Sequence, residues 1–193
     1  MDMTTEVEKW IEEEGVAYLK NLGIKENQTV LDFGCGSGHY TIPAAKVVGA
    51  KGKVYAIDKD SEVLNQTMET IRDEGLKNVT PILDDSEELE IDLESGAVDA
   101  ILFYDMLHFM EAEKRKRLYE NAHKVLKSNG LLSVYPKHYK RDNLPEWNLE
   151  DMELDDIIEE IEQSSFRLES KSQKTLLHDD YINEGYVLNF RKA

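Results

Sequence analysis

Cysteine is almost missing from this sequence of 193 residues, which contains only Cys35. A single cysteine cannot form an internal disulfide, and it cannot build a zinc site from several thiolates. A reactive thiol also needs a neighbouring base or cation, whereas Cys35 lies between glycines. We therefore expect Cys35 to serve packing rather than nucleophilic catalysis.

Positive charge is also scarce, because 23 lysines and arginines face 40 aspartates and glutamates, which gives a formal net charge of −17. Sequence-independent affinity for nucleic acid comes from basic side chains that replace counterions on phosphate. The basic run from Lys114 to Arg117 is short, and we expect it on the exposed face of a helix. The composition therefore disfavours bulk DNA or RNA as a partner.

Long apolar runs are absent, and no internal repeat interrupts the chain. Residues at the start are acidic and lack the basic region and apolar core of a secretory signal. We therefore expect no membrane insertion and a cytoplasmic location. The length suits one hydrophobic core, so the sequence predicts a single domain over residues 1–193.

Three glycines at alternate positions follow an apolar stretch that ends on an acid, in the run from Val30 to Gly38. Glycine permits an abrupt turn with positive φ and lets a ligand approach the main chain closely. A dinucleotide-binding loop would follow the spacing GxGxxG, but the place of its third glycine is taken by His39. The run therefore predicts a binding loop that departs from the NAD pattern.

With Asp32 ahead of Gly34, Gly36 and Gly38, this segment resembles motif I of the class I S-adenosylmethionine-dependent methyltransferases. The resemblance implies an α/β fold of the doubly wound, three-layer, Rossmann-like type. Its seven-stranded sheet is mostly parallel, and the last strand is antiparallel between the fifth and sixth. It also implies S-adenosylmethionine as cofactor, S-adenosylhomocysteine as product, and no metal.

A second apolar stretch, Val54 to Ile57, ends on Asp58, about twenty residues after the glycines. A βαβ unit places an acid there against ribose hydroxyls, and the resemblance gives Asp58 that role. A simpler interpretation is that Asp60 or Ser61 caps the next helix, but it leaves Asp58 unexplained.

The third signal is the stretch Ile82 to Leu89, which resembles the segment of the family that contacts adenine. Asp85 is the expected acceptor for the adenine amino group, with the Ser86 amide as donor, and Asp84 is the alternative acceptor. The acids between Asp84 and Glu94 are also consistent with nothing more than a solvated face.

The fourth signal is the apolar stretch from Val98 to Tyr104, which resembles the fourth strand of the family. Ligands of open α/β sheets lie beyond the carboxyl ends of strands, so Tyr104, Asp105 and His108 are expected at that rim. His138 follows the expected fifth strand. If the acceptor loses a proton, Asp105, His108 or His138 is the candidate base. The resemblance implies a cofactor site composed of Asp32, Gly34, Cys35, Gly36, Gly38, Tyr40, Asp58, Lys59, Asp84, Asp85, Ser86 and Tyr104.

The remaining pattern predicts the rest of the fold. Residues 1–24 are expected to form an N-terminal helical lid, and Leu118, Ala122 and Val125 have helical spacing. Asn129 and Gly130 predict a turn before a fifth strand. The C-terminal third predicts a helix over 150–163, a strand within 166–176 and a strand over 185–191.

The leading hypothesis is a methyltransferase that acts on a small molecule, because the chain has no large inserted substrate domain and is strongly negative. One alternative is a protein that binds S-adenosylmethionine or a partner without catalysis. A nicotinamide-dependent oxidoreductase is a further alternative, which the glycine spacing disfavours. We expect a monomer or a homodimer.

Overall fold

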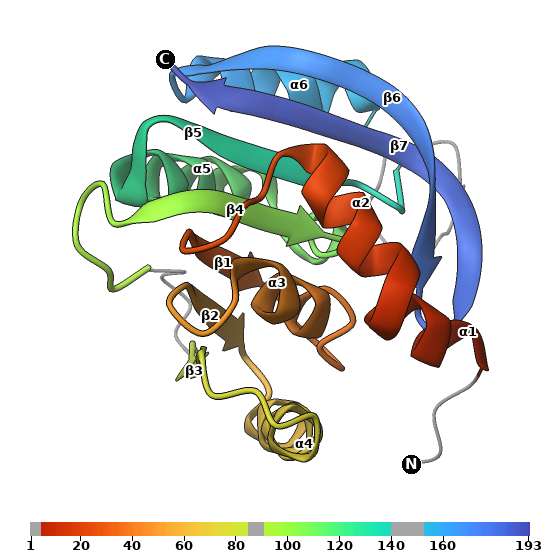
Figure 1. Ribbon diagram of the computed structural model, residues 1–193. Coiled ribbons are helices and arrows are strands. Elements are labelled where there is room, and N and C mark those ends of the chain that lie inside the picture. Colours follow the sequence, from red (N-terminus) through yellow and green to blue (C-terminus); the bar gives the residue numbers. More distant parts are fainter. Residues whose placement is uncertain (1–4, 85–90, 140–152) are drawn as a thin grey trace. The chain divides into compact units, whose positions relative to one another are not determined.

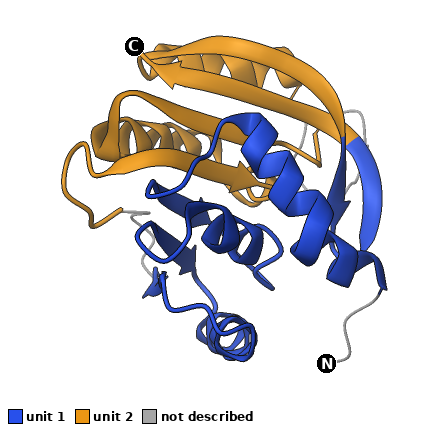
Figure 2. Cartoon of the chain, viewed as in Figure 1, with its two compact units in different colours: residues 1–85, 175–184 blue, residues 86–174, 185–193 orange. Residues whose placement is uncertain are grey.

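The computed structural model describes residues 5–84, 91–139 and 153–193 (Figure 1). The fold is α/β, and its strands are hydrogen-bonded in the order β3-β2-β1-β4-β5-β7-β6. This confirms the predicted seven-stranded mixed sheet with the last strand between the fifth and sixth. The chain divides into two compact units, residues 1–85 with 175–184 (unit 1) and residues 86–174 with 185–193 (unit 2) (Figure 2).

Unit 1 begins with three consecutive helical segments and continues with alternating strands and helices. Its elements are α1 (Thr5–Lys9), the π-helix η1 (Trp10–Glu14), α2 (Gly15–Leu22), β1 (Thr29–Phe33), α3 (Thr41–Val48), β2 (Lys53–Asp58), α4 (Ser61–Asp73) and β3 (Val79–Leu83). The helical part of the predicted N-terminal segment is present, whereas its π-helical turn was not predicted. The single-domain organisation and the lid role stay predictions.

Strands β1, β2 and β3 are parallel, and their register brings their carboxyl ends to one edge. Phe33 pairs with Ile57, and Asp58 pairs with Leu83. Strands of this kind read as near-continuous apolar runs because both faces are covered, as in the buried stretch Val30 to Phe33. The residues that follow β1, β2 and β3 therefore lie along the same edge.

Unit 2 contains β4 (Val98–Tyr104), the 3₁₀ turn η2 (Leu107–Phe109), α5 (Ala112–Val125), β5 (Leu126–Tyr135) and α6 (Leu154–Gln163), together with most of β6 (Phe166–His178) and β7 (Tyr181–Lys192). The segments 175–178 of β6 and 181–184 of β7 belong to unit 1. Strand β5 runs parallel to β4 and antiparallel to β7.

The predicted turn at Asn129 and Gly130 is instead an irregularity inside β5. Val98 pairs with Leu126, but Ala100 pairs with Leu131, so extra residues bulge out between the two pairs. Asn129 has φ of 60°, a left-handed conformation that asparagine tolerates better than most residues. The Asn-Gly signal was correct about the backbone bend and wrong about the start of the strand, because β5 already begins at Leu126.

Arg115 was predicted on an exposed helix face, and this was wrong, because the residue is only 3% exposed. Its Nε and Nη2 donate to the carboxylate of Glu160 at 2.9 and 2.6 Å, and its Nη1 donates to the Met110 carbonyl at 2.7 Å. The arginine therefore joins α5 to α6 and to the end of η2.

Helix α6 begins at Leu154, because Glu153 forms a capping box with Asp156. Residues 150–152 of the predicted helix lie outside the described residues.

Candidate active site

The glycine loop in unit 1 turns sharply after β1. Gly34, Gly36 and Gly38 have φ of 76°, 48° and 80°, all in the left-handed region that favours glycine. The amides of Gly34 and Cys35 both donate to the Ile57 carbonyl, at 2.8 and 2.9 Å. These bonds fasten the loop to the end of β2, and the positive φ angles explain why the three positions are glycine.

Gly36 and Gly38 differ in their surroundings. A Cβ added at Gly38 would lie 2.8 Å from Thr67 Cγ2, so helix α4, which contains Thr67, packs directly against the glycine. A Cβ added at Gly36 would meet no atom within 4 Å, so this side of the loop is open. Thr67 Oγ1 donates to the Gly36 carbonyl at 2.6 Å and helps to hold the loop. The structure therefore separates a packing glycine from one that leaves space for a ligand.

Asp58 lies at the end of β2 and contacts the open part of the loop. Its Oδ2 accepts from the Gly36 amide at 2.9 Å, and its Oδ1 accepts from the Asp60 amide at 3.0 Å. A carboxylate has about four acceptor sites, so each oxygen keeps capacity for one further donor. Asp60 in turn caps α4 by accepting from the amides of Glu62 and Val63, as one interpretation of the sequence predicted. Capping by Asp60 therefore leaves Asp58 available for a separate role.

Asp32 is buried at the end of β1, with 3% of its surface exposed. Burial raises the pKa of its carboxyl to about 6, the hydrogen bond from Thr41 lowers it, and the charge of Asp58 raises it further. Thr41 Oγ1 donates to Asp32 Oδ2 at 2.6 Å. The acid ahead of the glycines is therefore an interior residue of β1 and not a surface charge.

The other predicted cofactor residues of unit 1 occupy different environments. Cys35 packs in a small core cluster with Ala56 and Leu64, and burial raises the pKa of its thiol, which suits the expected packing role. Tyr40 is nearly buried and donates its hydroxyl to the Leu177 carbonyl at 2.8 Å. Lys59 is exposed, and the Asp84 amide donates to the Asp58 carbonyl at 3.0 Å. Asp85 and Ser86 lie outside the described residues.

Sequence reasoning missed the contact between Trp10 and the residue after the glycines. The Trp10 indole Nε1 donates to the His39 carbonyl at 3.0 Å, and the Trp10 and Tyr40 rings meet edge to face at 5.4 Å. Gly15 allows this arrangement, because a Cβ there would lie 2.7 Å from the indole nitrogen. The N-terminal helices thereby contact the binding loop within unit 1.

Tyr104, at the end of β4 in unit 2, is buried in a chain of hydrogen bonds. Its hydroxyl lies 2.8 Å from Ser133 Oγ, which donates to Asn189 Oδ1 at 2.8 Å. Asn189 Nδ2 donates to Ser170 Oγ at 3.1 Å. This network joins β4, β5, β7 and β6, so Tyr104 has a structural setting that its predicted cofactor role did not include.

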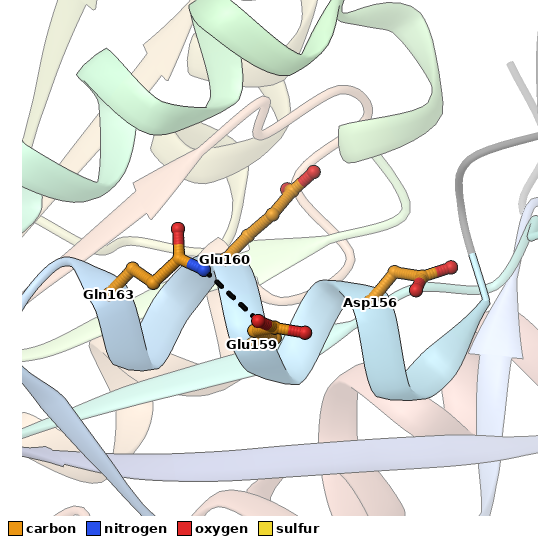
Figure 3. Close-up of a pocket in the computed structure, with 4 residues that line it drawn as sticks. All are labelled: Asp156, Glu159, Glu160 and Gln163. Atoms are coloured by element: carbon orange, nitrogen blue, oxygen red, sulfur yellow. Dashed lines mark hydrogen bonds between the residues drawn. The ribbon is translucent and has the colours of Figure 1, made fainter.

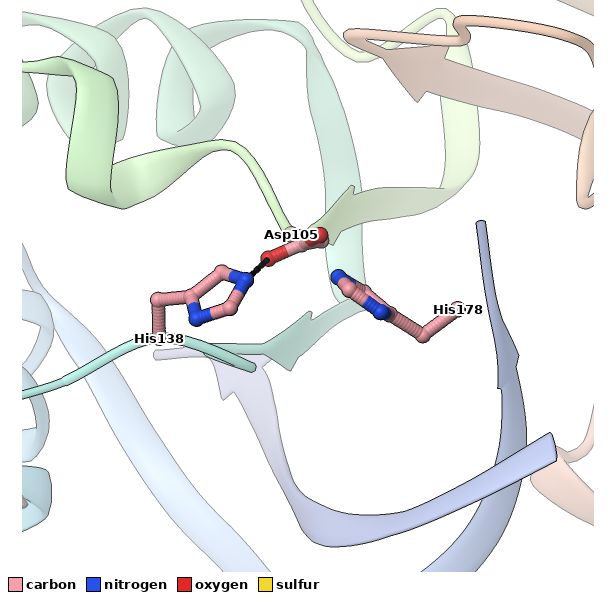
Figure 4. A group of neighbouring side chains, drawn as sticks. All are labelled: Asp105, His138 and His178. Carbon is pink, nitrogen blue, oxygen red and sulfur yellow. Dashed lines mark ion pairs between the residues drawn. The ribbon is translucent and has the colours of Figure 1, made fainter. Parts of the chain in front are cut away.

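The three predicted bases lie together in unit 2. Asp105 Oδ1 is 3.6 Å from His108 Nδ1 and 3.8 Å from His138 Nε2, and Figure 4 draws the ion pair between Asp105 and His138. The His108 and His138 rings meet edge to face, with centroids 4.9 Å apart. The carboxylate therefore faces imidazoles from two different segments, an arrangement suited to proton transfer.

Asp156, Glu159, Glu160 and Gln163 line a depression along α6 (Figure 3). Glu160 there is paired with Arg115, and Gln163 donates to Glu159 at 3.3 Å, so these three side chains already have partners within the protein. None of the helices in the described ranges has the length and apolarity that crossing a bilayer requires.

Comparison with known proteins identifies the class to which this fold and loop belong. The family of proteins described as "Methyltransferase domain" matches residues 24–180. The chain therefore belongs to this family and has the fold of the class I S-adenosylmethionine-dependent methyltransferases. The cofactor of that class is S-adenosylmethionine.

Individual relatives support the same class and differ in their substrates. A probable cobalt-precorrin-6B C(15)-methyltransferase (decarboxylating) of Sulfurisphaera tokodaii is 30% identical over 123 residues, 64% of this chain and 60% of that protein. A fibrillarin-like rRNA/tRNA 2'-O-methyltransferase of Thermococcus sibiricus is 28% identical over 151 residues, 76% of this chain and 65% of that protein. The chain thus spans less than two thirds of the length of these relatives.

A solved structure of a SAM-dependent methyltransferase from Aquifex aeolicus superposes with a TM-score of 0.73 at 25% identity. The match covers 96% of this chain and 93% of that one. The similarity therefore extends over the N-terminal helices and the C-terminal strands as well as the glycine loop.

Proposed function

We propose that this chain transfers a methyl group from S-adenosylmethionine to a small-molecule acceptor by in-line displacement. The observation that carries the proposal is the open side of Gly36 beside a carboxylate with spare acceptor capacity. A vicinal diol needs two acceptors, and each oxygen of Asp58 retains one. Asp58 therefore fits the ribose of an adenosine that lies against the main chain of the glycine loop.

The chain contributes binding and orientation. S-adenosylmethionine supplies a methyl group already activated on a sulfonium, so the protein needs mainly to hold the reactants in line and exclude water. In this proposal Asp58 accepts from the ribose hydroxyls, Gly36 lets the ligand reach the main chain, and Gly34 and Gly38 give the loop the positive-φ turns that shape it. The 2.6 Å hydrogen bond from Thr41 to Asp32 joins the start of α3 to the end of β1 and so holds the two ends of the loop.

The adenine contacts remain a prediction from the sequence. Asp85 and Ser86 are assigned to the adenine edge in this proposal, with Asp84 as the alternative acceptor. Cys35, Tyr40, Lys59 and Tyr104 complete the predicted set. The assignments of Tyr40 and Tyr104 are the least direct, because their hydroxyls already bond to Leu177 and Ser133.

A small acceptor is favoured over a nucleic acid by the net charge of −17, since a polyanion repels phosphate. The relatives named above include a tRNA and rRNA methyltransferase, so RNA is the competing class of acceptor. A cytoplasmic location and a monomeric or homodimeric state complete the proposal.

The test combines binding and turnover. Calorimetry of the purified protein with S-adenosylhomocysteine and with NAD is expected to detect only the former. Incubation with methyl-labelled S-adenosylmethionine and a metabolite extract is then expected to label a small molecule, whereas added total RNA stays unlabelled. Binding of NAD alone would refute the cofactor assignment. Label in RNA would refute the acceptor class, and cofactor binding without label in any fraction would favour a non-catalytic binding protein.

A further inference from the structure

The two imidazoles of unit 2 that face Asp105 are not equivalent. The His108 side chain is 3% exposed and contacts the Phe109 ring at a tilt of 44°, with ring centroids 3.8 Å apart. The His138 side chain is 16% exposed, and that of Asp105 is 25% exposed. A bound molecule can therefore reach Asp105 and His138, whereas His108 is enclosed.

The accessible pair is fixed by one main-chain group. The Tyr135 carbonyl accepts from the Asp105 amide at 2.8 Å and from the Lys137 amide at 3.0 Å. The first bond holds the residue after β4, and the second forms the tight turn that leads to His138. Asp105 has φ of 54°, so the turn at the end of β4 departs from extended backbone to present this side chain.

The distance within the pair leaves room for a third group to bridge the two atoms, and it is too long for a direct hydrogen bond. Asp105 Oδ1 and His138 Nε2 are 3.8 Å apart, which exceeds ordinary hydrogen-bond length. A hydroxyl oxygen placed between them can lie within hydrogen-bond reach of both atoms. The carboxylate is also close enough to offset a positive charge that forms on the imidazole.

We infer that His138 is the proton acceptor of the reaction, assisted by Asp105, and that the methyl acceptor is a hydroxyl, a phenol or an acidic carbon. This assignment rests on the proposed function. The bond from the methyl carbon to sulfur breaks and leaves its electron pair on sulfur, while an electron pair of the acceptor forms the new bond to that carbon. The proton of the acceptor passes to His138 Nε2, and Asp105 balances the charge of the imidazolium.

His108 acts through Asp105 and is a positioning residue. Its Nδ1 lies 3.6 Å from the same Oδ1 that faces His138, on the enclosed side of the carboxylate. Asparagine can place an amide nitrogen close to the position of Nδ1, whereas alanine cannot. The two substitutions at residue 108 therefore separate positioning from simple packing.

The experiment measures label transfer from methyl-labelled S-adenosylmethionine by the full chain. The probes are catechol, benzyl alcohol and acetylacetone, which lose a proton on methylation, and dimethyl sulfide, which does not. Label is expected in at least one of the first three probes. His138→Gln and Asp105→Asn are each expected to lower kcat by about 100-fold or more, the usual effect of losing a general base. His108→Ala is expected to lower kcat, and His108→Asn to restore most of it.

Binding of S-adenosylhomocysteine is the second measurement, and it is expected to be unchanged in every variant. His123→Gln, which removes a histidine of α5, is the matched control and is expected to keep full activity. The assignment would be overturned if catechol, benzyl alcohol and acetylacetone all stayed unlabelled, whether or not dimethyl sulfide was labelled. A kcat within about threefold of wild type in both His138→Gln and Asp105→Asn, far from the loss expected of a general base, would also overturn it. Failure of the wild-type protein to bind S-adenosylhomocysteine would instead refute the proposed function.

Discussion

Replacing Gly38 by alanine is expected to destabilise the protein through two separable effects. The residue has φ of +80°, and a left-handed conformation costs an L-residue about 1 to 2 kcal/mol. The new Cβ would also lie 2.8 Å from Thr67 Cγ2, and overpacking of this kind costs about 1 to 3 kcal/mol. The free energy of unfolding is therefore expected to fall by about 2 to 5 kcal/mol.

Thr67→Ser provides the matched background, because it removes Cγ2 and keeps the hydroxyl that donates to the Gly36 carbonyl. In that background Gly38→Ala is expected to cost only the backbone strain, about 1 to 2 kcal/mol. Gly36→Ala should cost a similar amount, since φ is +48° and no atom lies within 4 Å of its Cβ. Gly36→Ala is nevertheless expected to weaken binding of S-adenosylhomocysteine, because the methyl group enters the open side of the loop.

Urea denaturation of the four proteins in the Gly38 and Thr67 cycle measures the coupling directly. The expected coupling free energy is about 1 to 3 kcal/mol, which corresponds to several degrees in Tm for a chain of this length. Equal losses from Gly38→Ala in both backgrounds would refute the claim that Thr67 limits the space. A Gly36→Ala variant that binds S-adenosylhomocysteine normally would refute the claim that the open side receives the ligand.

Three further substitutions test other parts of the structure. Asp58→Ala should weaken binding of S-adenosylhomocysteine in calorimetry by about 1.5 to 3 kcal/mol, whereas Asp60→Ala should cost about 1 kcal/mol of stability and leave affinity unchanged; equal affinities would remove Asp58 from the site. Because burial raises the Asp32 pKa from 3.8 to about 6, the folded state binds this proton more tightly, and that stabilisation is lost as pH rises through this interval. The free energy of unfolding of Asp32→Asn, measured in urea, should therefore rise relative to that of wild type by up to about 3 kcal/mol as pH increases from about 4 to about 7. A difference that stays constant over this pH range would contradict the raised pKa. Glu160→Ala leaves a buried arginine without its carboxylate and should cost about 3 kcal/mol in thermal unfolding, while the neighbouring Glu159→Ala should stay near wild type; similar effects of the two would argue against a buried ion pair.

The strands and the binding loop could be predicted because their signals are local. Apolar runs that end on Asp32 and Asp58 mark buried parallel strands, and the fold places the ends of such strands along one edge. The sequence therefore predicted which residues gather in unit 1. It could not predict that Asp58 accepts from the Gly36 amide, because that bond depends on how closely the loop folds back over β2.

Contacts between distant residues account for most of what was missed. Thr67 bonds to a glycine 31 residues away, and Trp10 bonds to a carbonyl 29 residues away, so neither residue stands out locally. Arg115 did have a usable signal, because it precedes the buried residues Leu118 and Tyr119 of α5 by three and four positions. Its place within a basic run concealed the helical periodicity that points it inward.

The hydrogen bond from Trp10 to the His39 carbonyl lets the intrinsic tryptophan fluorescence of the protein report on the glycine loop. Indole emission shifts in wavelength with the polarity around the ring and with the bonding of its nitrogen. Trp10 is one of only two tryptophans, and only 2% of its surface is exposed. Its indole nitrogen bonds to His39, the residue that follows the glycines. A spectrum recorded with Trp147 replaced by phenylalanine would therefore report whether the loop rearranges, without any attached dye.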